Sequence, residues 1–474
     1  MSVEKFFGYV DEHQDAFVER LREAVAIPSV SADVDLRPEV FRMADWMVKQ
    51  LEDLGASTQK LDLGNQEKGG KVIPLPPIVL ASFGNDKNKK TILVYGHFDV
   101  QPALKEDGWN TEPFELHEDD QGRLIGRGSS DDKGPILGWI NVLEAHKKLG
   151  LELPVNLKMC FEGMEESGSV GLDEAIYREA DKFFADVDCV CISDNYWLGT
   201  TKPALTYGLR GVSYFHMKIE GPGRDLHSGV FGGAVHEPMV DLVHLMSKLV
   251  SPDGKILIPG IYDEVAPLTE EESATYNNLD FSLDDIHAAI ESKNTIHQSS
   301  KDALMHRWRY PSLSVHGVEG AFYSSGEKTV IPACVTGKFS IRTVPNMNPE
   351  KVTEIVTKFV EQEFERLGSK NKLAITCGHA GPSWVTSPNH WNYVAAAKAV
   401  ERVYKVKPEL TREGGSIPVT LTFQEALKKN VLLLPMGRAD DGAHSINEKL
   451  DRSNYINGTK LLGAYLYEVA AAQV

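Results

Sequence analysis

Between residues 78 and 194 the sequence alternates short apolar runs with helical segments, and this alternation constrains the fold more than any other feature. The apolar runs cover residues 78–82, 91–95, 155–161 and 187–192. Helices are predicted after Pro135 and after Gly171. Such a pattern is typical of a largely parallel β-sheet with helices on both faces. We therefore predict an α/β fold for this part of the chain.

A change of pattern near Tyr207 indicates a second domain. Alternating polar and apolar residues, as at 212–219, predict antiparallel strands with one solvated face. A helical segment at 391–403 restores the first pattern. At 474 residues the chain also exceeds what one hydrophobic core usually serves. We predict one domain over residues 1–207 and 386–474, interrupted by an inserted α+β domain over residues 208–385.

Composition and charge exclude several classes of function. The sequence has 50 basic and 68 acidic residues and a net charge of −18, which argues against nonspecific binding to nucleic acid or to an anionic membrane. It has no N-terminal basic segment followed by an apolar core and no run of 18 apolar residues, so we expect a cytoplasmic protein. The five cysteines include no C-x-x-C pair and are expected to be reduced thiols.

Polar side chains follow three of the apolar runs, at the points where the strands are predicted to end. His97 and Asp99 follow the second run, Glu165 and Glu166 follow the third, and Asp194 follows the fourth. In open α/β sheets, ligands bind beyond the carboxyl ends of the strands. We therefore expect these five side chains to converge.

Two further candidates come from loops. Asp131 and Asp132 precede a helix whose first turn suits Pro135, so their carboxylates lie at the positive end of that helix. An aspartate there is usually a cap, and only its neighbours favour a role in chemistry. His444 belongs to a polar stretch, residues 437–445, that follows another apolar run at 431–435.

Together these residues are typical of a metal site. Taken singly, each has a structural interpretation, such as a core histidine, a solvated helix start or a strand-end cap. Imidazole and carboxylate together suit Zn²⁺ or Mn²⁺ better than Ca²⁺ or Mg²⁺. A catalytic zinc normally has three protein ligands, so five ligands indicate two metal ions that share a bridging carboxylate and a water. Such a pair lowers the pKa of the water and polarises a carbonyl oxygen, which is the chemistry of amide hydrolysis.

A hydrolytic site also needs a carboxylate that is not a ligand, to take the proton of the attacking water and pass it to the leaving amine. Glu165 and Glu166 are adjacent and would point in opposite directions if extended, so one can bind metal while the other serves as the base. The residue types alone do not distinguish them. Asp99, two residues after His97, is placed to hold the imidazole in its ligating tautomer.

Five motifs resemble the successive motifs of the two-zinc metallopeptidases that include carnosinase, and the resemblance covers essentially the whole chain. They are GHFDVQP (96–102), GRGSSDDKG (126–134), EGMEESGS (162–169), SDN (193–195) and DGAHS (441–445). The resemblance implies that residues 1–207 and 386–474 form a two-metal catalytic domain, and that residues 208–385 form a lid and dimerisation domain. It implies that Glu165 is the base and that Asp99 supports a ligand. The implied ligands are His97 and Asp194 on one ion, Glu166 and His444 on the other, and Asp131 bridging both.

The same resemblance implies a set of substrate contacts. His227 would reach into the site of a partner subunit and stabilise the oxyanion, which requires a homodimer. Arg342 would clamp the free carboxylate of the substrate, a bidentate role for which lysine is a poor replacement; the alternative is an ion pair on a strand surface. Gly415 and Ser416 would bind the same carboxylate through backbone N–H groups and a hydroxyl. Thr329 and His379 are implied as further contacts.

The leading hypothesis is a two-metal dipeptidase that uses Zn²⁺ or Mn²⁺ and hydrolyses dipeptides such as Cys-Gly, which is a product of glutathione breakdown. An N-acyl amino acid amidohydrolase would use the same metals but would not require a free substrate amine. A non-catalytic binding protein on a peptidase fold is the third alternative. The presence of Glu165 and of the complete ligand set counts against this third alternative.

Overall fold

The computed structural model describes residues 2–68, 70–290 and 292–473, and the chain divides into two compact units. Unit 1 comprises Met1–Tyr207, Thr386–Thr411 and Val419–Val474, and unit 2 comprises Gly208–Val385 and Arg412–Pro418. The segment 412–418 was predicted to belong with the first domain but groups with unit 2. The reason is that the Arg210 N–H of unit 2 donates hydrogen bonds to Glu413 O and Gly415 O, at 3.3 and 3.2 Å.

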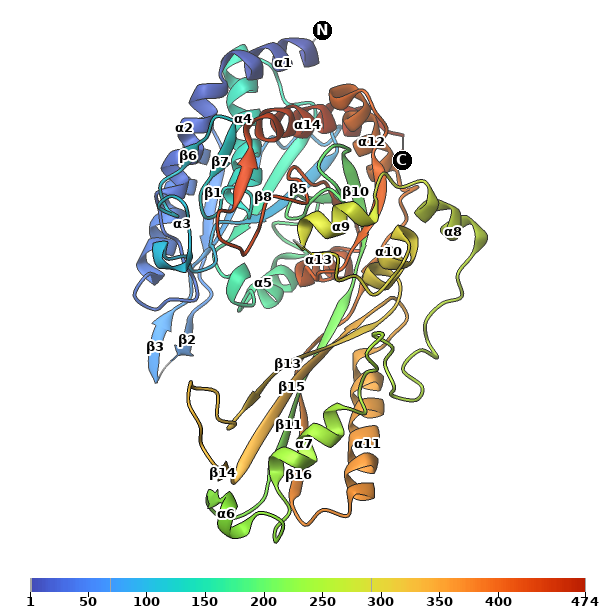
Figure 1. The fold of residues 1–474 in the computed structure, drawn as a ribbon. Coiled ribbons are helices and arrows are strands. Elements are labelled where there is room, and N and C mark those ends of the chain that lie inside the picture. Colours follow the sequence, from blue (N-terminus) through green and yellow to red (C-terminus); the bar gives the residue numbers. More distant parts are fainter. Residues whose placement is uncertain (1, 69, 291, 474) are drawn as a thin grey trace. The chain divides into compact units, whose positions relative to one another are not determined.

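A large mixed sheet forms the centre of unit 1 (Figure 1). Its strands, in spatial order, are β1 (Ser57–Leu61), β4 (Ile78–Phe83), β8 (Asn156–Glu162), β5 (Thr91–His97), β9 (Cys189–Ile192), β19 (Asn430–Leu433), β10 (Ala204–Leu209) and β17 (Trp384–Val385), with β18 (Glu409–Glu413) also beside β10. The four strands from β8 to β19 are parallel, and the outer pairs are antiparallel. Every residue of β5 is buried, as expected for a strand covered on both faces. The predicted α/β fold with a mostly parallel sheet is confirmed.

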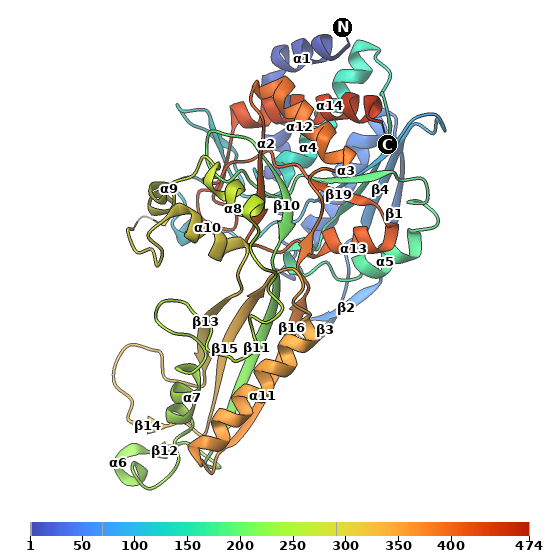
Figure 2. The same ribbon diagram turned by 90° about the vertical axis from the view of Figure 1, so that its right-hand side faces the viewer.

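Helices cover both faces of this sheet (Figure 2). On one face, Val94 of β5 belongs to a core that includes α1 (Ser2–Glu12), α2 (Gln14–Val25), α3 (Arg37–Leu54), α4 (Lys133–Leu149), α12 (Trp391–Tyr404) and α14 (Arg452–Ala471). On the other face, the Tyr95 ring contacts Phe423 of α13 (Pro418–Leu427), with centroids 5.6 Å apart, and α13 is hydrogen bonded to α5 (Leu172–Glu179). Consecutive residues of a strand face opposite ways, so Val94 packs against one layer of helices and Tyr95 packs against the other. Among the described residues, no helix is both long enough and apolar enough to cross a membrane.

The parallel pairing brings the carboxyl ends of three strands to one edge of the sheet. His97, the last residue of β5, pairs with Glu162, the last residue of β8. Tyr95 pairs with Ile192, the last residue of β9. The loops that follow these strands therefore start side by side, as the sequence predicts.

A small three-stranded sheet joins two of the loops at this edge. β6 (His117–Glu118) and β7 (Arg123–Ile125) form a hairpin, and β20 (Lys449–Asp451) pairs antiparallel with β7. Just beyond this pairing, the Gly126 N–H donates to Glu448 O at 2.9 Å. The loop that carries Asp131 therefore runs beside the end of the segment that carries His444. A separate hairpin is formed by β2 (Asn65–Lys68) and β3 (Lys71–Pro74).

Unit 2 is built on a four-stranded antiparallel sheet, in the order β13 (Ser312–Glu319), β15 (Cys334–Thr343), β11 (Gly211–Glu220) and β16 (Lys372–Gly381). Buried residues alternate with more exposed ones along β11, as expected for a sheet with one covered face. Apolar residues of α7 (Pro238–Met246) and α11 (Pro349–Leu367) pack on the covered face. The remaining elements are β12 (Leu226–His227), α6 (Ser228–Phe231), α8 (Glu270–Asn277), α9 (Leu283–Ala289), α10 (Ser300–Trp308) and β14 (Val330–Ile331).

Candidate metal centre

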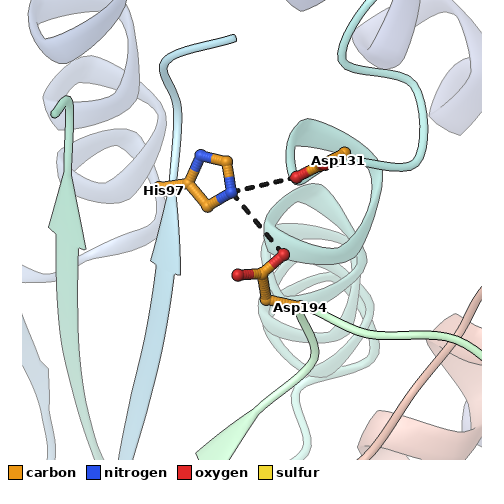
Figure 3. A group of neighbouring side chains, drawn as sticks. All are labelled: His97, Asp131 and Asp194. Carbon is orange, nitrogen blue, oxygen red and sulfur yellow. Dashed lines mark hydrogen bonds and ion pairs between the residues drawn. The ribbon is translucent and has the colours of Figure 1, made fainter. Parts of the chain in front are cut away.

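One group of candidate ligands lies at the carboxyl edge of the sheet, where His97 faces two aspartates (Figure 3). The Nε2 atom of His97 lies 3.1 Å from Asp131 Oδ1 and 3.6 Å from Asp194 Oδ1. His97 ends β5, Asp194 follows β9, and Asp131 comes from the loop before α4. One ligand atom from each residue lies within 4.8 Å of the others, which is a spacing that a single metal ion can span.

A second group shares Asp131 with the first. The Nε2 atom of His444 lies 3.1 Å from Asp131 Oδ2 and 3.1 Å from Glu166 Oε2. Asp131 therefore presents one oxygen to each histidine, which is the arrangement that a bridging carboxylate requires. A third acidic group, formed by Asp440, Asp441 and Asp451, is already paired with two cations of the chain, the Lys449 ammonium and the Arg438 guanidinium.

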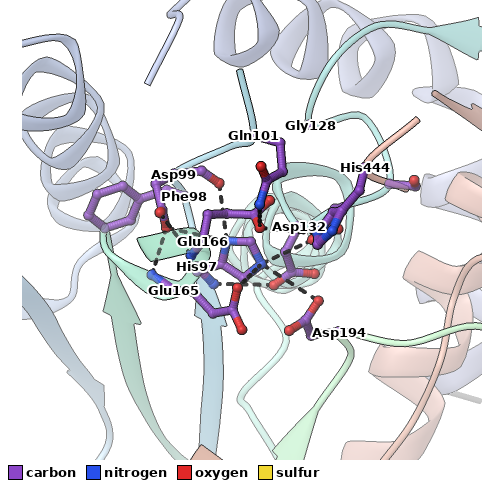
Figure 4. A network of polar contacts seen from close by, with 12 residues as sticks. His97, Phe98, Asp99, Gln101, Gly128, Asp132, Glu165, Glu166, Asp194 and His444 are labelled. Carbon is purple, nitrogen blue, oxygen red and sulfur yellow. Dashed lines mark hydrogen bonds and ion pairs between the residues drawn. The ribbon is translucent and has the colours of Figure 1, made fainter. Parts of the chain in front are cut away.

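Asp99 contacts both the first histidine and the loop that follows β8 (Figure 4). The His97 Nδ1 atom lies 3.1 Å from Asp99 O and 3.4 Å from Asp99 Oδ1. The two carboxylate oxygens of Asp99 accept the backbone N–H groups of Glu165 and Glu166, each at 3.1 Å. With Nδ1 held by Asp99, Nε2 of His97 is the nitrogen that faces the other carboxylates.

The structure distinguishes the two adjacent glutamates. They lie in a 3₁₀ turn, Glu165–Ser167, and not in an extended segment, in which adjacent side chains would point in opposite directions. Successive side chains of a 3₁₀ turn still point about 120° apart, because the turn has about three residues. Glu166 belongs to the second ligand group, whereas Glu165 Oε2 lies 4.0 Å from His97 Nε2 and belongs to neither group.

The carboxylates around the two histidines favour the protonated form of each imidazole. Hydrogen bonds to Asp131 and Glu166 raise the pKa of His444 to about 10. Burial lowers the pKa of His97, but the carboxylates of Asp194 and Asp131 outweigh burial and raise the pKa well above its usual range. On each histidine, the proton lies between the imidazole nitrogen and the carboxylates, which is where a metal ion could bind instead.

The pKa values of the surrounding carboxylates are shifted as well. Burial raises the pKa of Asp194 to about 6, and it raises the pKa values of Glu165 and Asp132 well above their usual range. Burial also disfavours the charged form of Asp131, but hydrogen bonds from His444 and His97 lower its pKa below the usual value. Asp132 Oδ1 is buried and lacks a hydrogen-bond partner among the described residues. The group therefore carries more carboxylates than its own cations can neutralise.

This donor set fits divalent cations. Six carboxylates and two imidazoles gather here: Asp99, Asp131, Asp132, Glu165, Glu166, Asp194, His97 and His444. Ions bound between the imidazole nitrogens and the carboxylates would replace the protons and lower the mutual repulsion. Mixed imidazole and carboxylate donors suit Zn²⁺ and Mn²⁺.

Gln101 and Glu448 also belong to this network, although residue patterns did not point to them. Gln101 Nε2 donates to Glu166 Oε2 at 2.7 Å. Glu448 accepts hydrogen bonds from the backbone around Asp131. Gln101 lies within the motif GHFDVQP, so the motif could have indicated that Gln101 belongs to the site. Glu448 lies outside every quoted motif.

Three of the predicted substrate-binding residues lie together in unit 2. Arg342 Nη1 donates to Ser416 Oγ at 3.0 Å, and Ser416 Oγ donates to Arg210 O at 2.5 Å. The Arg210 N–H donates to Gly415 O, which holds the 414–416 loop beside Arg342. Burial lowers the pKa of Arg342. Among the described residues no carboxylate forms an ion pair with Arg342.

The other three substrate candidates are exposed elsewhere in unit 2. His227 lies on β12 opposite Val330, and the next residue, Ser228, donates its backbone N–H to Thr329 O at 3.1 Å. His379 lies on β16 opposite Tyr214. Within the described part of the chain, no hydrogen bond or ion pair joins these three residues to Arg342. All the metal-ligand candidates belong to unit 1 and the six substrate candidates to unit 2.

The fold and the ligand groups define a class of hydrolase, and the comparisons with known proteins agree. The model of peptidase family M20/M25/M40 matches residues 93–468. The chain belongs to this family of peptidases. The resemblance to the metallopeptidases that include carnosinase is therefore confirmed.

Individual relatives narrow the comparison. The Cys-Gly metallodipeptidase dug1 of Schizosaccharomyces pombe is 59% identical over 471 residues, which cover 99% of each chain. The solved structure of the di-peptidase Dug1p from Saccharomyces cerevisiae has a TM-score of 0.92 and 54% identity, and the match covers 100% of this chain and 99% of that one. Human carnosine dipeptidase 1 has a TM-score of 0.92 and 47% identity over 99% of both chains. The motifs predict a likeness to the Cys-Gly metallodipeptidases in particular, and the first of these relatives bears that name.

Metal binding to the metal-free protein should release protons. Both histidines have raised pKa values, so near pH 7 an incoming cation must displace their protons, and the affinity for Zn²⁺ should rise with pH. Calorimetry in buffers of different ionisation enthalpy should detect proton release at pH 7, with at least one proton from each histidine. Ca²⁺, which prefers oxygen ligands, is the control and should bind weakly. Tight Zn²⁺ binding that is independent of pH and releases no protons would contradict this account of the site.

Proposed function

We propose that this protein is a metal-dependent dipeptidase that hydrolyses dipeptides such as Cys-Gly with two divalent cations, Zn²⁺ or Mn²⁺. The observation that carries the proposal is the Asp131 carboxylate, whose two oxygens each lie 3.1 Å from a different histidine. The name of the Schizosaccharomyces pombe relative, which is 59% identical, supports the substrate class. The five free cysteines support a reducing compartment such as the cytoplasm.

The two ligand groups divide the proposed metal site between two ions. His97 and Asp194 would hold one ion, Glu166 and His444 would hold the other, and Asp131 would contact both. When bound, such a pair supplies Lewis acidity and a water of lowered pKa. Asp99 would keep His97 in the tautomer whose Nε2 is free to bind metal.

Glu165 is the residue we assign as the general base. It stands outside both ligand groups, with Oε2 4.0 Å from His97 Nε2, so it could face a water held by the ions without being occupied as a ligand. Burial raises its pKa well above the usual range of a carboxylate, which favours proton uptake near neutral pH. It would take a proton from the water and deliver it to the leaving amine.

The group formed by Arg342, Gly415 and Ser416 would bind the free carboxylate of the dipeptide. The Arg342 guanidinium is partly buried and donates a hydrogen bond to the neutral hydroxyl of Ser416, and no carboxylate among the described residues pairs with it, so its charge is available to an anion. A guanidinium can donate two parallel hydrogen bonds to a carboxylate. Selection for a free carboxylate favours a dipeptidase over an enzyme that acts within long peptides.

His227, Thr329 and His379 would contact the substrate from unit 2, with His227 acting in the site of a partner subunit within a homodimer. The Nδ1 atom of His227 accepts the Gly229 N–H at 3.0 Å, which leaves Nε2 to donate outward. His227 and Thr329 are both exposed within their own chain. A donor at this position would stabilise the oxyanion of the tetrahedral intermediate by a few kcal/mol, about 3 in comparable sites.

Replacing the base should separate chemistry from metal binding. Glu165→Gln should retain two metal ions per chain but lower kcat by about 10²- to 10⁴-fold, because the attacking water loses its proton acceptor. Glu166→Gln is the matched control and should lose affinity for metal as well as activity. Metal content by mass spectrometry and turnover of Cys-Gly measure both effects. Unchanged turnover in Glu165→Gln would place the base elsewhere.

Arg342→Lys should weaken recognition of the substrate carboxylate. We expect kcat/KM for Cys-Gly to fall by about 10- to 100-fold, because lysine cannot form the paired hydrogen bonds of a guanidinium. On the C-terminal amide of Cys-Gly, which lacks the carboxylate, we expect low activity in the wild type and the same activity in Arg342→Lys. Arg366→Lys, at an exposed ion pair with Glu363 on α11, is the control and should leave both substrates unaffected. Equal losses on the acid and the amide would contradict the assignment.

Mixed dimers test whether His227 acts across subunits. His227→Ala alone should be nearly inactive while keeping its metal. Heterodimers of His227→Ala with Glu165→Gln should recover up to about half of the activity of a wild-type dimer, since one of the two sites then has both a working base and a working histidine. Absence of recovery in purified heterodimers would show that His227 acts within its own chain.

A further inference from the structure

Glu448 is a buried carboxylate that accepts five hydrogen bonds from one short segment of the chain. Its Oε2 atom accepts Arg127 Nη1 at 2.7 Å and the Gly128 N–H at 3.1 Å. Its Oε1 atom accepts the Ser130 N–H at 3.0 Å, the Ser130 hydroxyl at 3.2 Å and the Asp131 N–H at 3.0 Å. Both oxygens are therefore fully used within the loop that ends at Asp131.

The loop needs such a partner because its buried backbone N–H groups lie outside any strand. Gly128, Ser130 and Asp131 are buried, and an unpaired buried N–H is costly. Several N–H groups that point into one space make an anion-binding concavity. Here the anion is a side chain of the protein itself. The Arg127 guanidinium, which lies 5.2 Å from the centroid of the Trp109 ring, balances its charge.

The backbone of Glu448 is fixed by its own neighbours. The pairing of β20 with β7 and the hydrogen bond from the Gly126 N–H to Glu448 O hold it beside the loop. The Lys449 N–H donates to Asp441 O at 2.9 Å, and the Lys449 ammonium pairs with the Asp441 carboxylate at 2.7 Å. These contacts close residues 441–449 into one loop, and His444 lies within it.

Glu448 therefore connects the two loops whose side chains meet in the second ligand group. It shares a closed loop with His444, and its carboxylate holds the backbone of Asp131. The Asp131 and His444 side chains lie 3.1 Å apart. We propose that Glu448 is a positioning residue that sets the distance between Asp131 and His444 and thereby the affinity for metal. This inference rests on the proposed function, because it assumes that these two residues bind metal.

The amide of a glutamine cannot reproduce these contacts. Glutamine has nearly the shape of glutamate, but one oxygen is replaced by an NH₂ donor. In Glu448→Gln that NH₂ would face either the Arg127 and Gly128 donors or the Ser130 and Asp131 donors. One side of the loop loses its acceptor in either orientation. We expect the metal affinity to fall by about 10- to 100-fold, which is the range found when groups that support metal ligands are replaced.

The test compares metal binding in three proteins. Co²⁺ and Zn²⁺ affinities are measured by chelator competition for the wild type, for Glu448→Gln and for Glu179→Gln. Glu179 is the matched control, because it is a buried carboxylate of α5 whose ion pairs are with Arg178 and Lys182. The wild type is measured first. If it binds fewer than two ions per chain, the proposed function fails before Glu448 is tested.

The expected result is a selective loss of metal affinity. Glu448→Gln should show native circular dichroism, weaker Co²⁺ binding and an altered Co²⁺ absorption spectrum, and its activity should recover toward that of the wild type as metal is added. KM at saturating metal should be unchanged. Glu179→Gln should bind metal as the wild type does. If the wild type binds two ions and Glu448→Gln binds them with equal affinity and the same spectrum, the inference is overturned.

A milder variant covers the case in which Glu448→Gln does not fold. Ser130→Ala removes one of the five hydrogen bonds and leaves the carboxylate and its charge in place. It should lower metal affinity by about 2- to 5-fold, because a single hydrogen bond contributes on the order of 1 kcal/mol and the other four hydrogen bonds to the carboxylate remain. Metal affinity equal to that of the wild type in a folded Ser130→Ala protein would then overturn the inference.

Discussion

The sharing of one carboxylate between two histidines is the interaction on which the rest of the site depends. Asp131 Oδ1 faces His97 and Asp131 Oδ2 faces His444, each at 3.1 Å. Because the carboxylate is small and planar, it can serve both sides only if the two imidazoles approach from different directions. His97 comes from the end of a central strand, whereas His444 comes from a loop near the end of the chain. The fold must therefore bring distant parts of the sequence to one point with little error.

The parallel strands of unit 1 position the residues around His97, and the small three-stranded sheet positions the loops of Asp131 and His444. Register between β5, β8 and β9 aligns His97 with the loops that carry Glu165, Glu166 and Asp194. Pairing of β20 with β7 places the loop of His444 beside the loop of Asp131. Asp99 then ties the first histidine to the backbone of the two glutamates. Each ligand is thus held by at least one contact that does not involve metal, and this favours a site that is formed before the metal binds.

Much of this arrangement could be predicted from the sequence, because it follows from local patterns. The apolar runs locate β5, β8 and β9, and the polar residues at their ends locate His97, Glu166 and Asp194. Local patterns were less informative where the position of a residue depends on the pairing of strands that are far apart in the sequence. Glu448 follows no recognisable strand, and its importance appears only when β20 is paired with β7. The extended conformation considered for Glu165 and Glu166 was also wrong, since a 3₁₀ turn follows β8. The segment 412–418 was assigned to the wrong unit because the hydrogen bonds from Arg210 leave no trace in residue patterns.

The magnetic interaction between bound ions tests the shared carboxylate most directly. Two Mn²⁺ ions about 3.5–4 Å apart in one site are coupled through their bridging ligands. Electron paramagnetic resonance of the protein reconstituted with two equivalents of Mn²⁺ should therefore show a broad coupled spectrum, and Asp131→Asn should abolish the coupling. A spectrum of isolated Mn²⁺ ions in the unaltered protein, at full occupancy, would contradict the account.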